Sequence, residues 1–396
     1  MAAPNIGGHS REEELMVTMY QTPRGVQYDP LVVEVWDSDG DGPVGRIEQP
    51  ERLEVTWALK GAGTCVLEAA WSPLTDKLTP SDGRYLLVVH FNGLRHVGIP
   101  VTAEIYAKED APHDPRIKVV TASAWSMLDR QHIPPVPDKP ITQQESAEFY
   151  ELTAPVETVV KRLIEIGSER LGHPIVVTPD AGRGPERTIK ARFDRTGELV
   201  EEALMGSGYH LRLEAWLPGD PPLDGLTVPT APVIYAYVEP YRRVEGLVWT
   251  SESTDVGAWE YRDPEQKQPT CVVVRGKKRE GVPQRFYDFG RRPRRSWQAR
   301  EVVIDQKDEE QPHETAGKAL SEDLSDPSLE VELSPSLSWE FGVDGGYPRQ
   351  YRIGDYAEIR VPGLRAHRQV ITEVAVELTP VSLTVTPKVG SPDTKR

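Results

Sequence analysis

Four short runs of β-branched and aromatic residues between residues 51 and 135 constrain the fold more than any other stretch. Each run is bounded by Gly, Pro, Asp or Ser, which is typical of β-strands separated by turns. Residues 60–63 include two glycines and predict a hairpin between the first two runs. A small antiparallel barrel or sandwich is therefore expected. The runs cover residues 53–57, 64–68, 85–89 and 117–121.

After the fourth run the periodicity changes from that of a strand to that of a helix. Residues 124–130 can form two helical turns, and the prolines of residues 133–137 end them. A short helix therefore closes the first β-rich region, which we place at residues 1–137 as the first barrel domain.

Residues 138–216 have the pattern of a small α/β domain. Apolar side chains recur at i, i+3 and i+4 from Val156 to Ile164, which predicts an amphipathic helix. Thr153 is placed to cap its N-terminus, and Gly172 is placed to end it. The other elements are expected at residues 175–177, 197–205 and 210–216.

The last two segments return to strand patterns. Residues 217–312 form a β-rich segment with a basic loop, which we expect to contribute in part to a second barrel. Residues 313–396 combine a short helix, at 314–324, with strand runs of the second β-barrel domain. The predicted fold is mainly β with α/β insertions, comprising two antiparallel β-barrel-like domains and small α/β domains.

The chain is acidic, with a net charge of −16. This balance argues against a general nucleic-acid binder, because neutralising phosphates requires a basic surface. It suits a surface that DNA slides past, although we favour the simpler explanation that acidity only aids solubility. The N-terminus lacks a signal-peptide pattern, and no apolar run approaches about 18 residues, so no membrane insertion is expected. Cys65 and Cys271 both lie in strand runs and predict buried, reduced thiols.

Residues 37–48 match the calcium-loop pattern D-x-D-x-D-G followed by five residues and Glu. Asp37, Asp39, Asp41 and Glu48 would supply the hard carboxylate oxygens that calcium requires. The flanking segments are strand-like rather than helical, so an acidic, Gly-rich hairpin loop is the alternative. Calcium is the single cofactor candidate that the sequence offers.

A basic cluster interleaved with aromatic residues lies between residues 275 and 297. This pattern suits either single-stranded nucleic acid or an acidic protein surface, such as a neighbouring copy of this chain. We favour protein docking. The cluster comprises Arg275, Lys277, Lys278, Arg279, Arg285, Arg291, Arg292, Arg294 and Arg295, with Phe286, Tyr287, Phe289 and Trp297.

Catalytic signatures are not found in the sequence. His313-Glu314 has no second histidine at the spacing of a zinc protease, and neither a G-x-S-x-G elbow nor a P-loop occurs. The chain is therefore expected not to be an enzyme, and a wall hydrolase is the least favoured alternative.

Several segments, taken in order along the chain, carry a family resemblance. They are residues 53–67, 124–130 with the following prolines, 297–306, 351–359, 371–374 and 385–390. In this order of parts the chain resembles the phage tail hub proteins, also called baseplate hub or tail-associated proteins, of long-tailed actinobacterial phages.

The resemblance implies a structural virion protein built from two similar β-barrels, three copies of which form a pseudo-sixfold ring. Such a homotrimer would close or extend the tail tube at the tail tip after assembly in the host cytoplasm. The implied partners are the distal tail protein, the tape measure protein and the fibre or tip proteins, with transient DNA passage and no specific DNA binding. The alternative function is a multidomain β protein that recognises host cell-wall glycan.

Overall fold

The computed structural model describes residues 31–391 except 82, 222–225, 227, 254, 263–270, 277–282, 291–300, 307–311, 313–315, 317–327, 335–339 and 344–348. The described residues of 1–257 and 332–396 form one compact unit, and those of 258–331 form a second. No helix in the described residues is long and apolar enough to cross a lipid bilayer.

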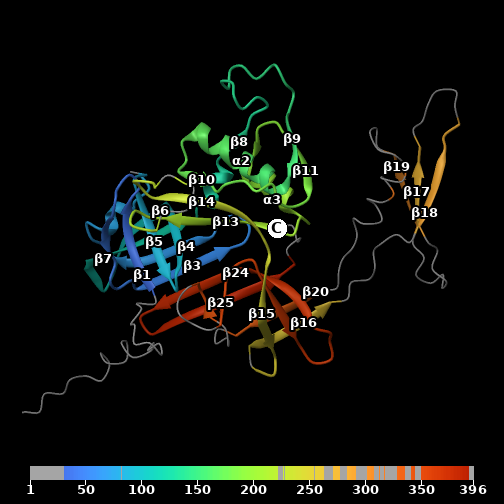
Figure 1. The fold of residues 1–396 in the computed structure, drawn as a ribbon. Coiled ribbons are helices and arrows are strands. Elements are labelled where there is room, and N and C mark those ends of the chain that lie inside the picture. Colours follow the sequence, from blue (N-terminus) through green and yellow to red (C-terminus); the bar gives the residue numbers. More distant parts are fainter. Residues whose placement is uncertain are drawn as a thin grey trace, which may run out of the picture. The chain divides into compact units, whose positions relative to one another are not determined.

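One large sheet dominates the first unit. Its strands are β1 (Leu31–Asp37), β2 (Pro43–Arg46), β3 (Arg52–Ala58), β4 (Thr64–Ala70), β5 (Tyr85–Phe91), β6 (Leu94–Lys108), β7 (Ala111–Ala122), β15 (Arg242–Thr250), β23 (Asp355–Arg360), β24 (His367–Thr379) and β25 (Ser382–Gly390). The order is β15-β23-β24-β3-β4-β7-β6-β5-β1-β2, with β25 paired to β24 (Figure 1). The four predicted strand runs lie in β3, β4, β5 and β7, and the predicted hairpin is confirmed because Leu53 pairs with Leu67.

Strand β24 joins the beginning of the chain to its end. Its residues 373–378 pair with β3, and its residues 367–370 pair with β23. Strands from both predicted β-rich regions therefore belong to one sheet. The mainly β fold class is confirmed, whereas barrel closure and the four-domain division stay predictions.

Alternation along the strands divides the sheet into a buried face and an open face. Leu53 and Val55 of β3 are fully buried, as are Leu67 of β4 and Val119 of β7. They pack in one core with side chains of β1 and β5. Successive residues of a strand point to opposite faces, so the residues between them lie on the other side of the sheet.

The α/β segment forms a second layered core in the first unit. Its elements are α1 (Trp125–Asp129), β8 (His132–Ile133), β9 (Tyr150–Pro155), α2 (Val156–Leu171), β10 (Ile175–Val177), β11 (Glu186–Ala191), β12 (Asp194–Arg195), α3 (Thr196–Leu204), β13 (Tyr209–Trp216) and β14 (Val233–Pro240). Helices α2 and α3, green in Figure 1, pack on the β10-β14-β13 sheet through one apolar cluster. The predicted closing helix and the predicted helices and strands of this segment are confirmed.

The predicted cap of α2 is wrong. Thr153 lies in β9, where its hydroxyl bonds that of Thr188 at 2.8 Å, and Pro155 is the N-cap residue. The pairing of β9 with β11 extends to Pro155, so the strand runs directly into the helix. Gly172 ends the helix as predicted, in the left-handed conformation with φ 69°.

The second unit contains a three-stranded sheet and most of a two-stranded ribbon. The sheet order is β18 (Phe286–Gly290), β17 (Cys271–Arg275), β19 (Glu301–Asp305), and β16 (Val256–Arg262) pairs with β20 (Ser328–Leu333). Apart from Ala316, the predicted helix at 314–324 lies outside the described residues. So does most of the basic cluster, of which Arg275, Arg285, Phe286, Tyr287 and Phe289 are described.

Short elements complete the described structure. They are the 3-10 helix η1 (Thr75–Leu78) and the paired strands β21 (Glu340–Phe341) and β22 (Gln350–Tyr351). Cys65 and Cys271 are buried and are not joined in a disulfide, as predicted.

Candidate functional site

The open face of the sheet is lined by charged side chains, with threonines and small aliphatic side chains between them. On β3, Arg52 and Glu54 alternate with the buried Leu53 and Val55 and are about two-fifths exposed. Arg52 bonds Glu377 of β24 at 3.2 Å, and across the sheet Lys118 lies 3.7 Å from Glu68. Between the charges, the residues of this face include Thr56, Val66, Val120, Ala375 and Thr384.

The cations on this face are paired with carboxylates of neighbouring strands. Besides Arg52 and Lys118, the Lys388 amine of β25 donates to Glu373 of β24 at 2.6 Å. A polyanion that contacts the face meets cations that are already neutralised within the sheet. The face is thus wet and polar, yet poorly suited to hold phosphates by salt bridges.

Two long edges bound this part of the sheet. Residues 101–108 of β6 pair with β7 alone, because the pairing with β5 ends at Gly98. Strand β25 pairs with β24 alone. Among the described residues, both edges therefore present backbone N–H and C=O groups without a strand partner.

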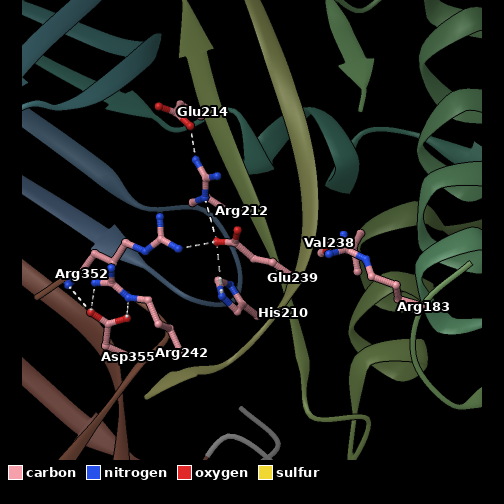
Figure 2. Close-up of polar contacts among 9 residues, drawn as sticks. All are labelled: Arg183, His210, Arg212, Glu214, Val238, Glu239, Arg242, Arg352 and Asp355. Atoms are coloured by element: carbon pink, nitrogen blue, oxygen red, sulfur yellow. Dashed lines mark hydrogen bonds and ion pairs between the residues drawn. The ribbon is translucent and has the colours of Figure 1, made fainter. Parts of the chain in front are cut away.

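A charge network of mostly half-buried side chains, with His210 and Asp355 buried, lies where β13 and β14 meet the last strands of the chain (Figure 2). The Glu239 carboxylate of β14 accepts from Arg212 Nε at 2.9 Å and from Arg352 Nη2 at 3.0 Å. His210 Nε2 lies 3.8 Å from the same carboxylate, and Arg212 also pairs with Glu214. These contacts connect the α/β segment to residues beside β23.

A second ion pair continues the network. Arg242 Nε and Nη2 donate to the two carboxylate oxygens of Asp355 at 2.7 and 2.6 Å, and Asp355 is fully buried (Figure 2). The Arg352 backbone N–H donates to Asp355 at 2.9 Å. The pKa of Arg242 is raised, first of all by this hydrogen bond. A bidentate geometry of this kind is both strong and directional.

Burial and neighbouring charges shift the titration of the network. Burial, which the Glu239 carboxylate only partly offsets, lowers the pKa of His210 to about 4. Burial by itself would raise the pKa of Glu239, but the hydrogen bond and charge of Arg212 and the charge of Arg352 hold it below its usual value. At neutral pH the His210 imidazole is therefore neutral and the Glu239 carboxylate is ionised.

A pocket of about 470 Å³ adjoins the network. Its wall combines aromatic residues, Trp57 and Phe341, with His96, His210 and Arg352. Burial lowers the pKa of His96 to about 4, so this side chain is also neutral. In the part of the chain that the structure describes, His96 Nε2 and His210 Nδ1 are buried without a hydrogen-bond partner.

The network is arranged for positioning rather than for chemistry. Its arginines and carboxylates neutralise one another, so they fix β13 and β14 against the last strands of the chain. Sequence reasoning did not find these residues, because their partners are distant: Arg242 and Asp355 are 113 positions apart. Arg212 between His210 and Glu214 on one strand was the sole local signal, and it indicates only a polar face.

The structure does not gather the predicted calcium ligands. Asp37 ends β1 and accepts from Arg84 Nη2 at 2.6 Å, which helps to lower its pKa below the usual range. Asp39 and Asp41 are exposed in the following turn, and Glu48 lies 3.6 Å from Arg46. Among the described residues, no group of three or more His, Cys, Asp or Glu side chains is placed to hold a metal ion. The calcium site stays a prediction.

Solved structures of phage tail proteins share this fold. The 43 kDa tail protein of prophage MuSo2 from Shewanella oneidensis is 13% identical, with a TM-score of 0.55, and the match covers 92% of this chain and 98% of that chain. The tail protein from Neisseria meningitidis MC58 is 13% identical with a TM-score of 0.49, covering 92% and 98%. Prophage tail protein gp18 from Listeria monocytogenes EGD-e is 11% identical with a TM-score of 0.49, covering 92% and 95%. The match to the MuSo2 protein shows that this chain has the fold of a phage tail protein.

The sequence itself identifies the family. Residues 32–391 match the family described as Siphovirus ReqiPepy6 Gp37-like protein, and the chain belongs to this family. No curated protein sequence matches the chain significantly. The resemblance to phage tail proteins is confirmed, and the actinobacterial host stays an expectation.

Proposed function

We propose that the protein is the central hub at the distal end of a phage tail, where three copies form a ring that closes or extends the tail tube. The observation that carries this proposal is the sheet β25-β24-β3-β4-β7-β6, which has a buried face, an open polar face and two free edges. An edge of this kind pairs readily with another chain. Head-to-tail pairing that closes under rotation gives a ring.

The two free edges are offset along the strands. Leu53 pairs through Leu67 and Val119 with Ala103 on one side, and through Leu378 with Leu383 on the other. These paired residues form one row across the sheet. From this row, the unpaired edge of β25 runs toward one end of the sheet, and most of the unpaired edge of β6 runs toward the opposite end. Pairing them between copies requires tilted strands, which is the geometry of a closed barrel.

The open face would then line the passage for DNA. Arg52, Lys118 and Lys388 are each paired with a carboxylate of the sheet, so none of the three is left unpaired to hold a phosphate. These paired charges fit transient passage of DNA without specific binding. The role is structural rather than catalytic, and it is exercised in the virion at the tail tip. The distal tail protein, the tape measure protein and the fibre or tip proteins are the partners that such a position implies.

Disulfide trapping in assembled tails tests the ring. Thr102→Cys on the β6 edge, combined in turn with Thr384→Cys, Thr386→Cys or Lys388→Cys on the β25 edge, should yield a covalent trimer on oxidation. Thr102→Cys with Ser81→Cys is the matched control and should stay monomeric. A reconstruction of the tail that shows six copies at one ring level, or no copy at the distal tip, would overturn the proposal.

A further inference from the structure

The β6–β7 hairpin projects beyond the rest of the sheet. Strand β4 pairs with β7 as far as Arg116, and the Trp71 N–H extends this ladder by one bond to the Pro115 carbonyl at 2.9 Å. Residues 107–114 lie past this point, in the part of the hairpin where β6 and β7 pair only with each other. A two-stranded ribbon alone is at best marginally stable in water, so the projection benefits from a partner.

An apolar patch lies at the base of this projection. Ile105 pairs with Ile117, which in turn pairs with Ala69, so the patch continues the buried face of the sheet. Ile117 and Ala69 are buried, but Ile105 is 49% exposed. Trp71 follows Ala69 by two residues and is 43% exposed, with its indole N–H donating to Asp76 at 3.1 Å. Trp71 and Ile105 thus lie on either side of β7, and a partly exposed Trp is typical of the energetically important residues of a protein interface.

The surroundings of the patch are acidic. Among the exposed side chains of residues 71–81 and 101–114, Lys108 is basic, whereas five are acidic. Asp76, Glu109, Asp110 and Asp114 belong to the patch side or the hairpin turn, with Asp114 paired to Arg116 at 2.7 Å, and Glu104 faces the open side of the sheet. A partner that covers the patch must therefore place basic side chains around an apolar centre.

The direction of the hairpin limits the choice of partner. The turns of the β6–β7 and β24–β25 hairpins both lie at the end of the sheet where Arg52 begins β3. Leu378, just before one turn, and Val119, on the strand that leaves the other turn, both lie in the row of Leu53 and Leu67. At the other end, Gly61 and Gly63 share the pocket wall with His210. In a ring closed through the sheet edges, the patch thus faces along the axis. A second copy docked there through its opposite end would extend into a filament, and one docked through the same patch would bring two acidic rims together, so the partner is a different protein.

We propose that Trp71, Ile105 and the acidic rim of the β6–β7 hairpin form an axial docking site for a different tail protein, one that presents basic side chains around an apolar surface. The inference rests on the proposed ring, because the ring gives the hairpin its axial direction. It names the contact surface, which the ring alone does not require.

Hydroxyl-radical footprinting of the wild-type protein provides the first test. Trp71 and Ile105 should be modified in the free full-length protein and at least about fivefold more slowly in purified phage tails. Unchanged modification of both residues in tails that contain the protein would overturn the docking site and leave the ring intact. Absence of the protein from tails would overturn the proposed function and the docking site together.

Paired variants provide the second test. Ile105→Glu and Trp71→Ala should keep the far-UV circular dichroism of the wild type, yet enter tails at least about tenfold less in a phage that lacks the wild-type gene. Ile141→Glu is the matched control, because Ile141 is 48% exposed and lies in the α/β segment; it should enter tails normally. Wild-type incorporation of the Ile105 and Trp71 variants would overturn the docking site, and footprinting decides the matter if either variant misfolds.

Discussion

At the residue scale, two charged groups of the α/β segment, Glu157 and Lys161, are buried together, and a third, Arg183, reaches them from a half-exposed position. Glu157 is fully buried and accepts from Lys161 at 2.6 Å and from Arg183 Nε at 2.8 Å. Burial by itself would raise its pKa, but these hydrogen bonds outweigh that effect and lower the pKa of Glu157 to about 2. A buried ion pair of this kind contributes little against an apolar replacement, yet breaking it is costly.

Glu157→Gln should lower the free energy of unfolding by about 3 kcal/mol, because it leaves the Lys161 ammonium buried beside a neutral amide. Denaturant unfolding followed by tryptophan fluorescence measures the change. Arg162→Gln is the control: its pair with Glu165 is about two-fifths exposed, so the expected change is within about 0.5 kcal/mol. Equal effects of the two substitutions would contradict the role assigned to the buried Glu157–Lys161 pair.

The two buried histidines predict a loss of stability in acid. His96 and His210 have pKa values of about 4 when folded, against about 6.5 in the unfolded chain. The unfolded state therefore takes up more protons below pH 6.5, and stability falls as the pH drops from about 6.5 to about 4. Thermal midpoints measured across this range should decline less steeply for His96→Asn than for the wild type. Identical slopes would show that His96 does not titrate on unfolding.

At the element scale, the turn into β23 is held by close packing. Gly354 has φ +87°, and a Cβ at this position would lie 2.6 Å from His210 Nε2. The turn therefore depends on glycine for two reasons, its backbone conformation and the space it leaves for the imidazole of β13. Through this contact, His210 of the charge network packs directly against the turn that leads into β23 of the sheet.

Gly354→Ala should lower the thermal midpoint more than Gly363→Ala. Both positions have positive φ, +87° and +78°, but nothing lies within 4 Å of a Cβ at Gly363. Each substitution introduces backbone strain of about 1 kcal/mol or more, and only the first also displaces His210. Differential scanning calorimetry of the two variants separates these effects, and a larger loss for Gly363→Ala would be evidence against the packing argument.

The acidic loop 37–48 gives an element-scale prediction for calcium. Excess calcium should raise the thermal midpoint relative to chelator, because a bound cation stabilises the folded state by mass action. Calcium would have to compete with Arg84 for Asp37. Asp39→Ala with Asp41→Ala should abolish the shift, whereas Glu109→Ala with Asp110→Ala, in another exposed acidic turn, should leave it unchanged. An equal midpoint in calcium and chelator would make the loop an acidic hairpin without a metal.

At the scale of the whole molecule, one sheet depends on both ends of the sequence. The first β core is built from residues between Val33 and Val119, whereas β24 and β25 come from the last 30 residues. The last strands cover the edge of β3 and supply one of the two free edges of the sheet. We therefore expect that the first core can fold without the strands on which the proposed ring depends.

Truncation after residue 331 should leave the first β core folded but prevent incorporation into tails. The core residues remain, whereas β3 loses its pairing with β24 and the β25 edge is gone. Hydrogen exchange should still show protection of Val55 and Val119, and complementation of a phage lacking the gene should fail. An unfolded first core, with unprotected amides at both positions, would mean that β24 is required for folding and not only for assembly.

The sequence by itself determined which residues form strands and helices and which face of each is buried. Alternation at Leu53 and Val55 and the helical spacing from Val156 to Ile164 depend on neighbours a few positions away, so local periodicity is sufficient to predict them. The cap at Thr153 was mispredicted because a β9–β11 pairing with distant residues outweighed a local preference.

Only the tertiary structure decided which strands meet and what lies between them. Val376 pairs with Val55 across more than 300 positions, and Arg242 with Asp355 across 113. Alternation specifies the face of a strand but not its partner, and an arginine in a sequence matches any carboxylate equally well. The open face, the free edges and the charge network therefore arise from pairings between distant residues, which local pattern does not encode.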